Sequence, residues 1–172
     1  MVLGEPLRSV AGDTGALASY IGVGLAVVLL GSVAIGATAP RWPVGWLRWD
    51  RGPTRLFAGD TSERYERLGA RRLKRFFPEM GAVFGGVSKN IPPDFADPQS
   101  IRDYLAEVRR AEWVHWLSML TPLPLPLFQP WWLAALFLVP VTLVNGSAEI
   151  ILRYNKIRLY GLLDALGAPR SG

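Results

Sequence analysis

Residues 15–39 read GALASYIGVGLAVVLLGSVAIGATA, and Tyr20 is the only ionisable side chain among them. As a helix, an apolar stretch of this length crosses the hydrocarbon core of a bilayer, which is roughly 30 Å thick. We therefore predict a transmembrane helix over residues 15–39. A cleaved signal peptide is the alternative, because Ala37-Thr38-Ala39 resembles a small-x-small cleavage site. A retained anchor is favoured, since the stretch exceeds an ordinary signal core and only Arg8 supplies positive charge before it.

The overall composition favours a membrane protein of one domain. The chain has 172 residues, 50% of them hydrophobic, and a net charge of +5. The apolar residues gather in two blocks while the charges lie between and after them, a segregation that favours a bilayer over one globular core. No RNA- or DNA-binding signature accompanies the positive charge, so nucleic acid is not an expected partner. The chain has no cysteine, which excludes disulfides, thiolate metal sites and a cysteine nucleophile.

A basic hydrophilic region follows over residues 40–111, where we expect a cytoplasmic or interfacial location. It opens with three tryptophans that are typical of the aromatic belt where a chain leaves the bilayer, namely Trp42, Trp46 and Trp49. Residues 62–77 predict an amphipathic helix whose basic face suits anionic lipid, although such charge runs also occur on ordinary solvated helices. Proline and glycine then predict a loop over residues 78–99.

A membrane-embedded helical hairpin is predicted over residues 112–152. Ser100 and Asp103 have capping-box spacing, so the helix that enters the hairpin should begin at Ser100. Three prolines between residues 122 and 126 end that helix, and this segment either crosses in a broken form or turns back within the bilayer. A second long span runs from Trp131 to about Leu152.

The basic residues predict the orientation of the chain. Most of them lie between the two apolar blocks, and the positive-inside bias places that region in the cytoplasm and the N-terminus outside. The hairpin then returns residues 153–172 to the cytoplasmic side. The predicted fold is a single membrane domain over residues 1–172. It is an all-α, multi-pass integral protein of the cell membrane, with an N-terminal transmembrane helix, a basic cytoplasmic region and a C-terminal membrane-embedded hairpin.

The one histidine of the chain, His115, is the first candidate for chemistry. Glu112 lies three residues earlier, so both side chains share a face of a helix. A carboxylate beside an imidazole holds the ring and stabilises its protonated form, which suits a histidine that takes a proton from an alcohol and later returns it. The alternative is a histidine that caps a helix or reaches the membrane surface.

A second polar set lies at the other end of the hairpin. Asn145, Glu149 and Arg153 recur every four residues and form one stripe on an otherwise apolar helix. Ionisable groups in such a place pair with each other or face a cavity, so Glu149 and Arg153 form either part of a site or a structural ion pair. Asn155 and Arg158 continue the polar set, and a guanidinium there suits a phosphate or a carboxylate. If both limbs of the hairpin advance similarly, this set meets the histidine at one depth.

These residues resemble the glycosyl-4,4'-diaponeurosporenoate acyltransferase family of carotenoid biosynthesis. The run Arg110-Ala111-Glu112-Trp113-Val114-His115-Trp116 is similar to an Arg-Ala-Glu-x-x-His-Trp stretch of that family. Asn145 and the run Arg153-Tyr154-Asn155 match its later motifs in spacing, and residues 65–78 carry a weaker likeness. The chain departs from the family pattern at three positions, where Pro, Gln and Arg are expected: Ser147, Leu152 and Lys156.

The resemblance implies transfer of a fatty acyl group to a sugar hydroxyl of a glycosylated carotenoid, in a staphyloxanthin-type pathway. It implies functional positions at Glu112, His115, Asn145, Arg153 and Asn155. On chemical grounds His115 is then the general base and Glu112 its orienting partner. Asn145 or Asn155 would donate a hydrogen bond to the developing oxyanion.

The resemblance and the chemistry also imply what the protein binds. Arg153 and Arg158 would hold the phosphate-bearing part of an acyl donor, and Arg110 is a further substrate-binding candidate. The expected partners are the lipid bilayer, an acyl-CoA-type donor as co-substrate and a glycosylated lipid acceptor, with no cofactor and no metal. No dinucleotide fingerprint, Walker loop, nucleophile elbow or two-histidine metal motif is present. A non-catalytic membrane scaffold, or another enzyme of lipid or polyprenyl metabolism, stays open as an alternative.

Overall fold

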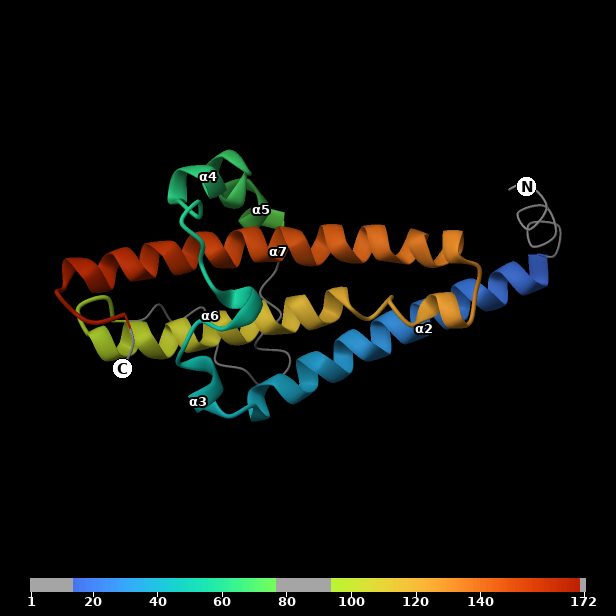
Figure 1. The fold of residues 1–172 in the computed structure, drawn as a ribbon, viewed down its shortest axis with the longest axis horizontal. Helices are drawn as coiled ribbons and strands as arrows, with labels where there is room; N and C mark the ends of the chain where they lie inside the picture. Colours follow the sequence, from blue (N-terminus) through green and yellow to red (C-terminus); the bar gives the residue numbers. More distant parts are fainter. Residues whose placement is uncertain (1–13, 77–93, 171–172) are drawn as a thin grey trace.

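The protein is described here by a computed structural model of residues 14–76 and 94–170, and these residues fold mainly into helices (Figure 1). The elements, in chain order, are α2 Thr14–Thr38, η1 Ala39–Arg41, α3 Val44–Leu47, η2 Gly52–Thr54, α4 Ser62–Arg67, α5 Ala70–Phe76, α6 Pro98–Met119, η4 Leu125–Leu127 and α7 Trp131–Ala165. No strand occurs among the described residues. The prediction of an all-α protein is thus confirmed, while most of the predicted loop over residues 78–99 lies outside the described part.

Two helices in the described ranges are long and apolar enough to cross a membrane, Thr14–Arg41 and Trp131–Ala165. The first contains α2, whose bounds lie within one residue of the predicted 15–39. Large apolar side chains on both helices point outward, such as Leu30 with 69% of its surface exposed and Leu143 with 65%. We call the exposed apolar surface of α2, of the α6–α7 turn and of the first half of α7 the apolar belt. Exposure of so much apolar surface to water would cost a large amount of free energy. A bilayer would cover this surface and remove that cost.

α6 and α7 lie side by side and run in opposite directions, while α2 crosses them obliquely (Figure 1). α7 does not end near Leu152, the predicted end of the second span, but continues to Ala165. Its last part packs against the first half of α6 in the largest core cluster, made of Ile101, Leu105, Val108, Leu152, Leu159, Tyr160 and Leu163. Residues 153–165, predicted as the start of a tail, are therefore one face of a packed helix pair.

The start of α6 differs from the prediction. Asp97 caps the helix, because its carboxylate accepts hydrogen bonds from the backbone N–H groups of Gln99 and Ser100 at 3.0 and 2.9 Å. Pro98 occupies the first helical position, where its missing N–H and fixed φ cost nothing. Asp97 followed by proline is a stronger start signal than the predicted capping box at Ser100.

The amphipathic helix predicted over residues 62–77 is divided into α4 and α5. Gly69 lies between them with φ +86°, a left-handed conformation that glycine adopts without a steric penalty. The two short helices pack on the side of α7 opposite to α3 (Figure 1). Tyr65 of α4 and Ala70 of α5 contact Tyr154 there, so the break directs this basic segment onto α7.

Candidate active site

The structure brings together two of the predicted site residues, one from each helix of the antiparallel pair. The Nδ1 atom of His115 on α6 lies 2.8 Å from the Oδ1 atom of Asn145 on α7. Both side chains are half-buried. The expectation that the histidine and the second polar set share one depth therefore holds for Asn145.

The hydrogen bonds of Asn145 determine which nitrogen of His115 carries the proton. The Nδ2 amide group of Asn145 donates to the backbone oxygen of Val141 at 2.9 Å, so its Oδ1 atom faces the imidazole. An amide oxygen only accepts hydrogen bonds, and Nδ1 of the neutral ring must then be the donor. The lone pair of the neutral imidazole is consequently on Nε2.

Glu112, predicted as the orienting partner of His115, is bound to Lys156. The Lys156 side chain has 0% of its surface exposed, and its Nζ atom donates to Glu112 Oε2 at 2.5 Å. It also donates to the backbone oxygen of Thr54 and to Asp50 Oδ1, the latter at 3.3 Å. Three acceptors match the three N–H donors of an ammonium group, which allows a lysine to be fully buried with its charge.

Asp50, which precedes η2, joins the same network to Arg109 and Tyr160. Arg109 Nε donates to Asp50 Oδ1 at 2.7 Å, and the Tyr160 hydroxyl donates to Oδ2 at 2.6 Å. Burial by itself raises the pKa of Asp50, but the charge of Lys156 and the hydrogen bonds from Tyr160 and Arg109 outweigh it. The net pKa of Asp50 is lowered from its ordinary value of 3.8. The carboxylate is therefore ionised at neutral pH and fastens the segment before η2 to both long helices.

Arg153 is held by η2 and by the segment that joins η2 to α4. Its Nη1 atom donates to Asp60 Oδ2 at 2.9 Å, and Nη2 donates to the backbone oxygen of Pro53. Burial raises the pKa of Asp60, but the Phe57 N–H, the Tyr65 hydroxyl and the charge of Arg153 together lower it below 3.8. A phosphate bound by Arg153, as predicted, would compete with Asp60 and the Pro53 backbone oxygen for the guanidinium.

Glu149 is the least satisfied acid of the described chain. Only 6% of its surface is exposed, and neither carboxylate oxygen has a hydrogen-bond partner among the described residues. The nearest ion pair is with Arg153 Nε at 3.8 Å. Three further buried polar atoms of the facing helix also lack such partners, Arg110 Nε, Glu112 Oε1 and Trp116 Nε1.

The other predicted site residues lie farther out. Asn155 is half-buried on α7, about 15 Å along the helix axis from Asn145, so the two amides do not serve one reacting centre. Arg158 is exposed, with its guanidinium carbon 5.7 Å from the centre of the Tyr154 ring. Arg110 forms an ion pair with Glu107 on its own helix.

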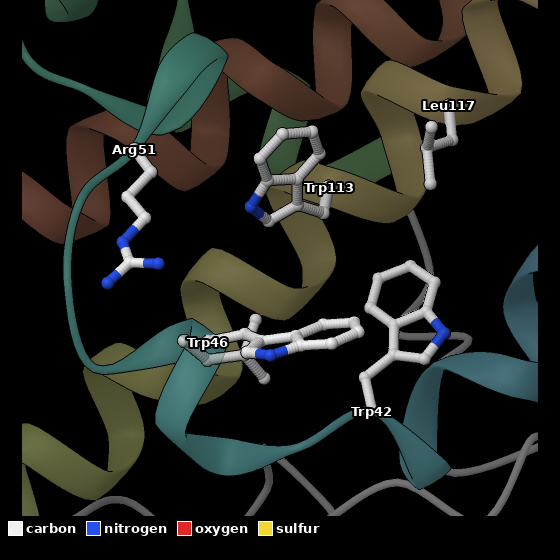
Figure 2. Close-up of a pocket in the computed structure, with 6 residues that line it drawn as sticks. Trp42, Trp46, Arg51, Trp113 and Leu117 are labelled. Atoms are coloured by element: carbon white, nitrogen blue, oxygen red, sulfur yellow. The ribbon is translucent and has the colours of Figure 1, made fainter.

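A cavity of about 370 Å³ opens on another face of α6. It is lined by Trp42, Trp46, Leu47, Arg51, Trp113 and Leu117. Figure 2 shows the indole rings of Trp42, Trp46 and Trp113 around the open space, with Arg51 to one side. No group of three or more His, Asp or Glu side chains in residues 14–76 and 94–170 is placed to hold a metal ion.

Sequence reasoning missed five residues of the buried network, which are Asp50, Asp60, Arg109, Lys156 and Tyr160. Their partners lie far away along the chain, so no local spacing predicts the pairs. One signal was available, because Asp50 is the single acid among the basic and aromatic residues 41–55. An isolated acid in such a segment is a candidate partner for a cation elsewhere in the fold.

Comparison with known proteins now identifies the family. No curated protein sequence and no solved structure matched the chain. A sequence model described as glycosyl-4,4'-diaponeurosporenoate acyltransferase matches residues 45–165, a stretch that includes the His115–Asn145 pair and the whole buried network. The match extends over more than half of the chain. The protein therefore belongs to the glycosyl-4,4'-diaponeurosporenoate acyltransferase family.

Proposed function

We propose that this protein is a membrane-bound acyltransferase. It moves a fatty acyl group from an acyl-CoA-type donor to a sugar hydroxyl of a glycosylated carotenoid or a similar lipid-soluble glycoside. Family membership supports the reaction class. The observation that carries the mechanism is the hydrogen bond between His115 and Asn145, at the boundary between the apolar belt and the buried ionic network.

In this mechanism His115 is the general base through Nε2. The sugar hydroxyl gives its proton to Nε2 while its oxygen attacks the carbonyl carbon of the acyl thioester. The tetrahedral intermediate then expels the thiolate, which takes the proton back from the imidazolium, and the new ester remains on the sugar. Asn145 holds Nδ1–H and keeps the ring in the tautomer that this transfer requires.

The same proposal gives the chain an orientation in the cell membrane. α2 rises about 37 Å and crosses the bilayer completely, with the N-terminus outside. From Asn145 to Trp131, α7 advances only about 21 Å toward the hairpin turn, less than the bilayer core. The hairpin thus enters from the cytoplasmic side and turns back inside the bilayer. The reacting groups lie near the cytoplasmic surface, within reach of a soluble acyl-CoA and a membrane-dissolved glycoside.

The direct test is an assay of the purified full-length protein in lipid nanodiscs with a glycosylated carotenoid and palmitoyl-CoA. Wild type should add the mass of one acyl group to the acceptor. His115→Ala should lower kcat by about 100-fold or more, since general acid–base catalysis contributes about 10²–10⁴. Asn145→Ala should lower kcat less, because the ring keeps its base but loses its orientation.

Trp131→Leu, on an exposed side chain at the first turn of α7, is the matched control and should keep full activity. Circular dichroism of each variant confirms that it is folded. Full acyl transfer by His115→Ala would remove the proposed mechanism. If the wild-type protein transfers no acyl group from any natural donor, the proposed function is wrong.

A scaffold function is the second candidate, and the dense ion pairing around Arg153 favours it. If the protein is a scaffold in which Glu149 and Arg153 only fasten helices, wild type should transfer no acyl group, and replacing both residues with leucine and methionine should change folding alone. If they serve catalysis, the double variant should fold and lose transfer. Thermal unfolding and the acyl-transfer assay on the same preparation separate these outcomes.

A further inference from the structure

The aromatic cavity in Figure 2 lies where the chain leaves the apolar belt. α2 ends at Thr38, and α3 follows directly beside the middle of α6 (Figure 1). Three apolar side chains on or next to α3 face outward, namely Val44, Trp46 and Trp49, with Trp46 63% exposed. Exposed tryptophans at such a position are typical of the headgroup level of a membrane. The cavity therefore opens at the surface of the lipid layer.

The segment that forms the cavity wall carries an excess of positive charge. Residues 41–55 contain four exposed arginines, which are Arg41, Arg48, Arg51 and Arg55. The one acid of the segment is Asp50, and its two oxygens already accept from Arg109, Lys156 and Tyr160. None of the four arginines forms an ion pair with a carboxylate of the described residues. The guanidinium of Arg51, which lines the cavity, thus attracts an external anion.

The cavity faces away from the proposed catalytic histidine. Trp113 and Leu117, which line it, are separated by about 40° around α6, at about 100° per residue. His115 lies about 160–200° from both of them, on the other side of the helix. An acyl donor bound in the cavity would not present its thioester to the His115 ring. The cavity therefore suits a molecule that stays bound and does not react.

From these observations we propose that the cavity is a binding site for an anionic phospholipid. The phosphate lies at Arg51, and the first part of an acyl chain lies among Trp42, Trp46 and Trp113. The positive charge of the segment selects a headgroup without a compensating cation, and the indoles provide amphipathic walls at the headgroup level. Bound there, the lipid joins α3 to α6 at the membrane surface. This site is separate from the proposed function and does not depend on it.

The test measures which lipid the purified full-length protein retains. The protein is reconstituted with equal amounts of dioleoyl phosphatidylglycerol and dioleoyl phosphatidylcholine, released into detergent, and analysed by native mass spectrometry. Both lipids offer a phosphate to Arg51, but only phosphatidylcholine carries a cation that the arginines repel. Wild type should therefore retain phosphatidylglycerol over phosphatidylcholine by about fivefold, the effect of one charge near a membrane surface. Arg51→Gln should abolish this preference, and Trp46→Leu should lower the retention of both lipids. Trp46 is mostly exposed, so its replacement leaves the core packing unchanged.

Two matched controls separate the cavity from general surface charge. Arg67→Gln removes one positive charge from α4, on the other side of α7, and should keep the wild-type preference. Trp131→Leu removes an exposed indole at the far end of α7 and should also keep it. Equal retention of the two lipids by wild type, or equal losses in Arg51→Gln and Arg67→Gln, would overturn the proposal. Displacement of the lipid by palmitoyl-CoA in wild type but not in Arg51→Gln would overturn it in favour of a donor site.

Discussion

Lys156 shows how much of this protein depends on single buried charges. Its ammonium group is fully enclosed and donates to Glu112, to Asp50 and to the Thr54 backbone. Such a group is stable only while its acceptors are present, because an unpaired charge in a protein interior costs several kcal/mol. Removing the charge of Glu112 should therefore change the stability of the protein by a different amount from removing that of Glu149, its neighbour on the facing helix.

Glu112→Gln should destabilise the folded state by about 3–5 kcal/mol, since it leaves Lys156 without its closest negative partner. Glu149→Gln is the matched control, because the Glu149 oxygens have no hydrogen-bond partner among the described residues. Its cost should stay below about 1 kcal/mol. Chemical unfolding in mild detergent measures both. Equal losses from the two variants would show that the ion pair is not what holds α6 to α7 here.

Asp50 should make the stability of the folded protein depend on pH in the acidic range. Because its pKa is lowered in the folded protein, its contribution is present above the ordinary value of 3.8 and is lost as the pH falls through the lowered pKa. At pH 7, Asp50→Asn should lower the thermal midpoint by several degrees, since Arg109 and Lys156 lose a shared partner. The curves of wild type and variant should begin to approach each other below about pH 4 and should meet only below the lowered pKa. Parallel curves across the whole range would contradict this account.

The candidate site could be predicted from the sequence only in part. The similar lengths of the two limbs led us to expect His115 and Asn145 at one depth, provided that both limbs advance similarly, and the hydrogen bond between the two side chains agrees with this expectation. The partner of Glu112 was not predictable in this way. Three positions compete for that carboxylate, namely His115, Arg109 and Lys156, and only the packing of α6 on α7 selects the lysine.

At the scale of elements, α2 is positioned by a close contact with α7. A Cβ atom on Gly24 would lie 2.4 Å from the Phe137 ring, whereas one on Gly22 would meet nothing within 4 Å. Gly24→Ala should therefore displace the ring and destabilise the α2–α7 contact by about 1–3 kcal/mol, as overpacking does.

The matched variant Gly22→Ala should be neutral or slightly stabilising, because alanine favours a helix. Thermal unfolding in nanodiscs compares the two. Adding Phe137→Leu to Gly24→Ala should restore most of the lost stability, since the smaller side chain makes room for the methyl group. No recovery in the double variant would mean that Gly24 acts through backbone flexibility instead.

The helix boundaries separate what local sequence determines from what tertiary packing determines. The bounds of the first long apolar helix were predicted within one residue, because the uncharged run that forms it has clear limits in the sequence. The continuation of α7 past Leu152 was not, since its charges are neutralised by residues 50–60. Its polar end therefore has the composition of a solvated tail and the packing of a core helix.

At the scale of the whole molecule, the apolar belt includes the first half of α7, whereas the buried ionic network joins the second half of α7 to the first half of α6. The proposed topology places Ala58 and Ala165 on the cytoplasmic side and Leu127 inside the bilayer. The chain has no cysteine, so single cysteines at these three exposed positions report accessibility without background.

In intact cells, a membrane-impermeant maleimide should label none of the three cysteines. After permeabilisation it should label Ala58→Cys and Ala165→Cys together, while Leu127→Cys stays protected. Labelling of Leu127→Cys from outside would show that the hairpin crosses completely. Labelling of only one of the other two would contradict a shared side.

The composite origin of the Lys156 pocket has a consequence for biogenesis. Its acceptors come from residues 50, 54 and 112, all of which the ribosome makes before the lysine itself. During translation Glu112 lacks its cationic partner until Lys156 is made, and the pairing of α6 with α7 is completed only when that last element emerges. A polypeptide cut short before residue 156 would leave the Glu112 carboxylate of α6 without this cation, at the boundary of the apolar belt.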